Sequence, residues 1–213
     1  MPVFLNTKDA DFNADFTSFL TNKRETTVEV DDIVVAIIDD VRKRGDAAVI
    51  DLTVKLDGFQ LSPETLAFTP AEIDAAIAKV PAAEAEALKL AADRIRAYHV
   101  KQLPQDAWWQ DASGAYLGWR WSAVEAAGLY VPGGLASYPS SVLMNAIPAK
   151  VAGVDRLTIC APTPNGQYNP LVLLAARLAG VETVYRIGGA QAIAAMAYGT
   201  ETIDKVDTIT GPG

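Results

Sequence analysis

Apolar residues recur at helical spacing through the first half of the chain. The spacing is clearest in residues 8–24, where Phe12, Phe16, Phe19 and Leu20 fall at i, i+4, i+7 and i+8. We expect this face to pack on the chain's own core, and a partner-binding arm is the alternative. Apolar spacing combined with cap and turn residues predicts further helices over residues 30–44, 46–56, 70–80 and 82–102.

Two aromatic runs flank a turn-forming segment in the middle of the chain. Trp108–Gln110 and Tyr116–Trp121 lie on either side of Asp111–Gly114, which predicts two antiparallel strands. All four tryptophans fall in this hairpin, at about residues 107–121. A platform that stacks nucleic-acid bases would use such residues, but the net charge of −8 disfavours it. We expect a hydrophobic lid or a subunit contact instead.

From residue 127 onward the pattern becomes a repeated strand and helix. Short apolar runs predict strands over residues 128–131, 156–161, 183–187 and 205–210, and helical stretches separate them. Strands separated by single helices form right-handed parallel crossovers. The chain is therefore expected to be α/β, with a helical region and small β-hairpin in residues 1–126 and a parallel α/β domain in residues 127–213.

Turns rich in glycine and proline follow the predicted strands. They are Pro132-Gly133-Gly134, Pro162–Gly166, Gly188-Gly189 and Gly211-Pro212-Gly213. The carboxyl ends of parallel strands share one edge of a sheet, where ligands bind, and glycines let a ligand approach the backbone. The alternative is that these glycines only make tight turns. Neither a Gly-x-Gly-x-x-Gly fingerprint after the first strand nor a Walker sequence is present, so the residues alone predict a ligand edge without naming the ligand.

Composition narrows the chemistry further. The acidic balance argues against nucleic-acid partners, and the apolar runs are too short for a membrane helix. The N-terminus lacks the pattern of a signal peptide, so we expect a cytoplasmic protein. The single cysteine, Cys160, lies in a predicted strand and is expected to be buried and structural, and the single histidine, His99, is expected to cap a helix or face solvent. With one Cys and one His, a zinc site built from this chain alone would be uncommon.

Several blocks of the sequence resemble the histidinol dehydrogenase family. They are Gly128–Gly134 (Gly-Leu-Tyr-Val-Pro-Gly-Gly), Ser141–Gly153, Gly188–Ala195, Tyr198–Glu201, Lys205–Asp207 and Gly211–Gly213. The likeness extends upstream through Arg44–Ala47, Leu52-Thr53 and Ile95–Gln102, so that it covers nearly the whole chain. The resemblance implies an incomplete Rossmann-like sheet, which agrees with the missing dinucleotide fingerprint.

The resemblance also implies an activity. Members of the family oxidise L-histidinol, an amino alcohol, through the aldehyde to L-histidine, reduce two NAD in succession, and hold the substrate with zinc. They are cytoplasmic homodimers whose subunits interlock. The positions that the family's pattern assigns to NAD binding are the side chains of Tyr130 and Gln191 and the backbone of Gly133, Gly134, Gly188 and Gly189.

The chain departs from the family pattern at one end. Family members continue past Gly-Pro-Gly into the zinc ligands and a Glu-His acid/base pair, so no catalytic or metal-binding residue is assigned within this chain. We therefore expect the N-terminal portion of such an enzyme, truncated at the C-terminal end of its α/β domain and inactive alone. Two alternatives stay open: a non-catalytic module that binds NAD or associates with other subunits, and a dehydrogenase of a related sulfonate alcohol.

Overall fold

The computed structural model of the chain describes residues 4–133 and 138–211, except for the side chains of residues 21–29. The helices are α1 Phe12–Arg44, α2 Asp46–Asp57, α3 Pro70–Ile77, α4 Ala82–Val100, α5 Pro139–Ala152, α6 Pro170–Ala179 and α7 Gly189–Tyr198. The strands are β1 Ala107–Gln110, β2 Tyr116–Trp119, β3 Ala126–Tyr130, β4 Arg156–Cys160, β5 Thr183–Tyr185 and β6 Thr208–Thr210.

A four-stranded parallel sheet forms the centre of the fold. Its strand order is β5-β4-β3-β6, and all of its strand pairs are parallel. The chain steps outward from β3 to β4 and β5, then returns to the other side of β3 to form β6. This order matches the first four strands, 3-2-1-4, of a Rossmann fold, in which the reversal of strand order marks the ligand-binding edge. The predicted α/β class and the predicted parallel sheet are confirmed.

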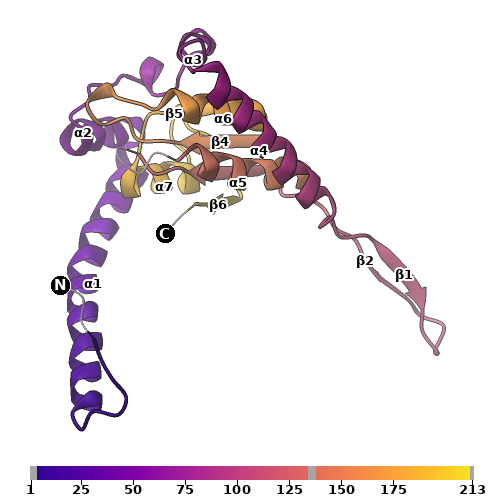
Figure 1. Cartoon of the computed structure of the whole chain (residues 1–213), viewed down its shortest axis with the longest axis horizontal. Coiled ribbons are helices and arrows are strands. Elements are labelled where there is room, and N and C mark those ends of the chain that lie inside the picture. The colour runs from indigo at the N-terminus through magenta and orange to yellow at the C-terminus, as the bar shows by residue number, and fades with distance from the viewer. Residues whose placement is uncertain (1–3, 134–137, 212–213) are drawn as a thin grey trace.

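Helices cover both faces of the sheet, because its side chains alternate between two apolar clusters. On one face, Leu129 and Ile159 pack in a cluster with residues of α3, α4, α5 and α6. On the other face, Cys160 and Ala126 pack in a cluster with residues of α1, α2 and α7. The helices before the sheet therefore complete its two outer layers (Figure 1). The division of the chain between residues 126 and 127 stays a prediction.

Helix α1 is longer than the sequence pattern indicates. Two separate helices were predicted over residues 8–44, and the structure has one helix of 33 residues. The reason is that residues 12–44 contain no proline and no glycine to break it. Its N-terminal part extends away from the α/β body (Figure 1), where Phe16, Phe19 and Leu20 are exposed, so the expected packing of this face on the chain's own core was wrong.

The predicted hairpin is confirmed. Strands β1 and β2 pair antiparallel, with Ala107 opposite Trp119 and Gln110 opposite Tyr116. The hairpin extends from the body beyond the end of α4 (Figure 1), and most of its aromatic side chains are exposed. Within the described part of the chain, no helix combines the length and the hydropathy needed to cross a membrane.

A buried carboxylate joins two segments that are far apart in the sequence. Asp46, the first residue of α2, is buried and accepts hydrogen bonds from the hydroxyls of Thr200 and Thr202, just after α7. In return, the Asp46 backbone N–H donates to Oε2 of Glu201 at 2.8 Å. Because these groups are about 155 residues apart in sequence, the joint fixes α2 against the end of α7.

We expect Asp46→Ala to lower the free energy of unfolding by about 3 kcal/mol, because it removes hydrogen bonds to a buried charged group. Urea denaturation would measure this loss. The matched control is Asp51→Ala, whose exposed side chain pairs with Arg44 and should contribute less than about 1 kcal/mol. Equal losses for the two variants would contradict a structural role for the joint.

Candidate functional site

The segments that follow three neighbouring strands meet at Pro162. Gly133 follows β3, Pro162 follows β4 and Gly188 follows β5. A Cβ atom added at Gly133 would lie 2.4 Å from Cγ of Pro162, and one added at Gly188 would lie 2.5 Å from Cβ of Pro162. Both contacts are closer than real Cβ atoms allow, so the proline fits between the two strands' ends only because both neighbours are glycine.

The fourth strand reaches the same edge. A Cβ atom added at Gly211, after β6, would lie 2.5 Å from the backbone oxygen of Tyr130. The predicted convergence of the glycine turns at one edge is thus observed for Gly133, Gly188 and Gly211. Gly134 lies outside the described residues, as do Pro212 and Gly213.

Tyr130 and Gly189 come together at this edge. Tyr130 is the last residue of β3, and its half-buried ring packs against the cluster that contains α7. The backbone N–H of Gly189, the first residue of α7, donates to the Tyr130 hydroxyl at 3.2 Å. The first N–H groups of a helix have no partner within the helix. The phenol therefore occupies one of the donors at the N-terminus of α7.

Gln191 is the least satisfied polar side chain of the site. It is 1% exposed, and among the described residues its Oε1 has no hydrogen-bond partner. The carboxamide folds back toward the start of its own helix, since a Cβ atom added at Gly189 would lie 2.5 Å from that Oε1. A buried acceptor without a partner costs about 1–3 kcal/mol. A ligand that donates a hydrogen bond here would recover that cost.

A pocket borders Pro162. Its volume is about 560 Å³, within the range of small-molecule sites. Pro132, Gly133 and Pro162 form part of its wall at the strand ends, and Phe68 and Tyr168 form an aromatic part. The two rings meet edge to face, with their centroids 5.0 Å apart. Pro162 therefore borders the pocket and also contacts Gly188, the residue that precedes α7.

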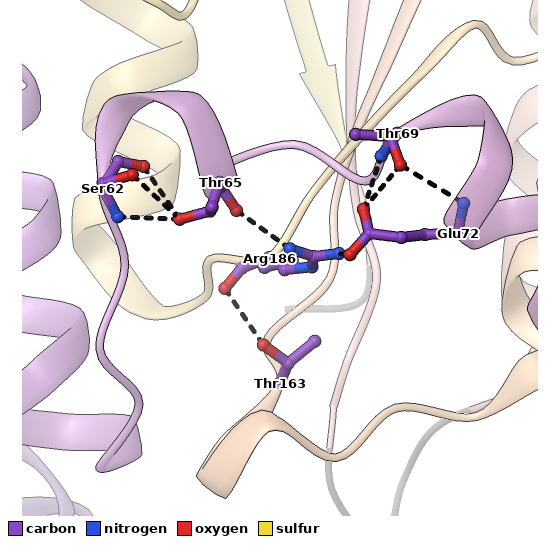
Figure 2. A network of polar contacts seen from close by, with 6 residues as sticks. All are labelled: Ser62, Thr65, Thr69, Glu72, Thr163 and Arg186. Atoms are coloured by element: carbon purple, nitrogen blue, oxygen red, sulfur yellow. Dashed lines mark hydrogen bonds and ion pairs between the residues drawn. The ribbon is translucent and has the colours of Figure 1, made fainter.

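Arg186 ties the end of β5 to the segment before α3 (Figure 2). Its buried guanidinium donates to the backbone oxygen of Thr65 at 3.1 Å and to Oε1 of Glu72 at 2.5 Å. It also lies 4.0 Å from the ring centroid of Phe68, a cation–π contact. The hydroxyl of Thr163, beside Pro162, donates to the backbone oxygen of Arg186 at 3.4 Å. This network therefore holds the walls of the pocket in place.

Glu72 takes part in both the network and a helix cap. With Thr69 it forms the capping box of α3, in which the Thr69 backbone N–H donates to Oε2 of Glu72 at 2.8 Å. That N–H, and after it the Arg186 guanidinium, hold the pKa of Glu72 below its ordinary value. The sequence analysis did not single out Arg186. The available signal was a charged residue inside the apolar run Val184–Ile187.

Cys160 and His99 lie outside this constellation. Cys160 is fully buried in β4, and burial raises the pKa of its thiol far above the ordinary value, which keeps it protonated. His99 is half-buried near the end of α4, edge to face with Tyr98. Over the described ranges, no group of three or more His, Cys, Asp or Glu residues could hold a metal ion.

The chain is similar to histidinol dehydrogenases in both sequence and structure. A family model described as histidinol dehydrogenase matches residues 20–213. Histidinol dehydrogenases of Cereibacter sphaeroides and Brucella abortus are 66% and 57% identical over all 213 residues, which span 49% and 50% of those relatives. The crystal structure of histidinol dehydrogenase from Elizabethkingia anophelis matches with a TM-score of 0.82 and 37% identity, over 86% of this chain and 42% of that one. The chain thus spans about half the length of the relatives it matches.

The stability of the fold should depend on pH through Glu72. Because the folded-state pKa of Glu72 is lowered from 4.5, its contribution is complete above that pH and is lost as the pH falls toward the folded-state value. We expect Glu72→Gln to lower the urea midpoint most near neutral pH, and the difference from wild type to shrink below pH 4.5. The exposed Glu86→Gln is the control. A difference from wild type that stays constant with pH would contradict the assignment.

Proposed function

The chain belongs to the histidinol dehydrogenase family, and on that premise we propose that it forms the N-terminal part of an NAD-dependent oxidoreductase of histidine biosynthesis. The complete enzyme would oxidise the amino alcohol L-histidinol through the aldehyde to L-histidine. The part described above would bind NAD at the edge where β3, β4 and β5 end. When bound, NAD supplies the hydride acceptor of the reaction.

The main support for the proposal is the buried side-chain oxygen of Gln191, which has no hydrogen-bond partner among the described residues. A buried carboxamide with an unpartnered oxygen costs stability unless something else satisfies it. A carboxamide both donates and accepts hydrogen bonds, and the ribose hydroxyls and the amide of a nicotinamide nucleotide do the same. The side chain also lies at the N-terminus of α7, where backbone N–H groups and the helix dipole favour ligand oxygens. The residues present therefore fit the dinucleotide.

The neighbouring residues would have distinct tasks in binding. Gly133, Gly188 and Gly189 present backbone without side chains, so a ligand can lie directly on the strand ends. We include Gly134 in the same role by its position in the family's pattern. Tyr130 would place its hydroxyl and ring beside the ligand, because its hydroxyl already meets the first N–H of α7 at 3.2 Å.

Zinc does not fit the part of the chain that the structure describes. Over those residues no cluster of three or more His, Cys, Asp or Glu is available to coordinate a metal. We propose that the zinc of the complete enzyme is held by residues outside this chain, and we assign no step to it here.

We also propose that the complete enzyme is a cytoplasmic homodimer. Support for the homodimer comes from exposed aromatic side chains that a second subunit could cover. They are Phe16 and Phe19 on α1 and the tryptophans of the hairpin.

We expect Gln191→Met to weaken NAD binding about tenfold, because one buried hydrogen bond to the ligand is lost. The same change should leave the unfolding free energy unchanged or raise it, since methionine has a similar shape and leaves no unpaired acceptor. Calorimetric titration with NAD and urea denaturation measure the two effects. Gln102→Met, at an exposed position, is the control. Unchanged NAD affinity, or a marked loss of stability, would count against a ligand role for Gln191.

The 213-residue chain alone should have no dehydrogenase activity. We expect the 213-residue chain alone, with L-histidinol, NAD and zinc, to form no NADH above a protein-free control. The reason is that its single histidine lies near the end of α4, outside the site, and its described residues provide no metal-ligand cluster. Absorbance of NADH would measure the reaction. Steady NADH formation that depends on histidinol would overturn this part of the proposal.

A further inference from the structure

We propose that Arg186 is a positioning residue for NAD binding, an inference that rests on the proposed function. Arg186 directly follows β5 and lies two positions before Gly188. It is not among the residues that line the pocket, and Figure 2 shows its side chain pointing toward Thr65 and Glu72. Because it is buried against these residues, the guanidinium can affect a ligand at the strand ends only through the backbone that connects Arg186 to α7.

The backbone of Arg186 is held from two sides. Its N–H donates to the backbone oxygen of Leu66 at 2.8 Å, and its C=O accepts from the hydroxyl of Thr163 at 3.4 Å. The N–H of Phe68 donates to the backbone oxygen of Val184 at 2.9 Å, so this segment runs antiparallel beside β5. The ladder between β4 and β5 ends one residue before Arg186. The contacts of Arg186 thus continue to hold the chain where the pairing of the parallel sheet stops.

The side chain of Arg186 fixes the direction of this segment as well as its place. The planar guanidinium donates to Thr65 and Glu72 and lies over the ring of Phe68. Glu72 is itself held by the capping box of α3, through its other carboxylate oxygen. A rotation of the backbone at Arg186 would therefore break several contacts together. Lysine, which lacks the planar face and the forked donors, could not replace them all.

Stability alone gives a weak reason for a charge at this position. The side chain of Arg186 is 9% exposed, and its neighbours Tyr185 and Ile187 are buried. Removing a guanidinium from water costs free energy, and apolar residues of similar volume often replace a buried ion pair without loss of stability. An apolar side chain could not supply the directional contacts to Thr65 and Glu72. Those contacts therefore point to a role in holding geometry.

The segment that follows is a turn of two glycines at the start of α7. Gly188 and Gly189 have no side chains, and the φ of Gly189 is 63°. Glycine loses more conformational freedom on ordering than other residues, and a ligand bears that cost unless the backbone is ordered beforehand. Arg186 and the buried Ile187 hold the chain before the turn, and the Tyr130 hydroxyl accepts from the Gly189 N–H at 3.2 Å. Arg186 thus lowers the cost of binding by ordering the turn in advance.

The test measures NAD affinity by calorimetric titration, and the amide signals of Gly188 and Gly189 by NMR, on the 213-residue chain. We expect Arg186→Met to weaken NAD binding about tenfold, because the turn must then be ordered on binding. The same change should shift both glycine amides in the absence of NAD. The matched control is Arg177→Met, since Arg177 pairs with Asp74 of the same helix α3 at 2.9 Å but is half exposed. The control should alter neither measurement.

A double-mutant cycle with Glu72→Gln separates positioning from general stability. Glutamine can still form the capping box of α3 with Thr69, but it removes the charge that pairs with Arg186. We expect Glu72→Gln to weaken NAD binding as well. The double variant should bind NAD no more weakly than Arg186→Met alone, because both changes remove the same contact. Glu72→Gln also keeps the test decisive if Arg186→Met does not fold.

The outcomes separate this inference from the proposed function. If the wild-type chain binds NAD and Arg186→Met binds it equally well, Arg186 has only a structural role and the NAD site stands. Additive losses of affinity in the double variant would also overturn the inference, because the two side chains would then act independently. If the wild-type chain does not bind NAD, the proposed function itself fails, and this inference fails with it.

Discussion

The packing of Pro162 between two glycines is the constraint on which the candidate site depends. Three strands end where a proline ring fits against Gly133 on one side and Gly188 on the other, at distances that leave no room for a Cβ atom. The sheet order puts β4 between β3 and β5, so the residue after β4 must lie between the residues that follow its neighbours. Any larger residue at 133 or 188 would push the strand ends apart. The ligand edge therefore exists because backbone, rather than side chains, lines it.

Stability and binding make opposite demands on the residues around this edge. The buried Gln191 oxygen has no partner among the described residues, and a buried polar atom left unpaired in a native structure calls for an explanation. The surroundings, by contrast, are well satisfied: Arg186 meets Thr65, Glu72 and Phe68, and Asp46 meets Thr200 and Thr202. These networks keep the strand ends and the start of α7 in place. Among the described residues, only Asp57 Oδ2, at the end of α2, is a second buried side-chain atom without a partner. Native proteins break such local rules mainly at functional sites, so we interpret the Gln191 oxygen as part of a ligand site.

Most of the fold could be predicted from local sequence signals, and most of the site's geometry could not. Apolar periods, caps and glycine turns mark the helices and strands because each depends on residues close in sequence, as in the Thr69–Glu72 capping box. The continuity of α1 was missed because the acidic residues Asp31 and Asp32 indicated the start of a second helix, although no proline or glycine breaks the chain there. Contacts such as Tyr130 with Gly189 and Arg186 with Glu72 join residues far apart in the chain. No local pattern specifies them, so the sequence located the edge but not the pocket beside it.

A crystal structure of the chain grown with NAD would test the proposed ligand edge directly. We expect the dinucleotide to lie at the edge where β3, β4 and β5 end, with a hydrogen bond from the ligand to the Gln191 carboxamide and ligand atoms against the backbone of Gly188 and Gly189. NAD bound at another surface, with the Gln191 oxygen still unpartnered, would contradict it.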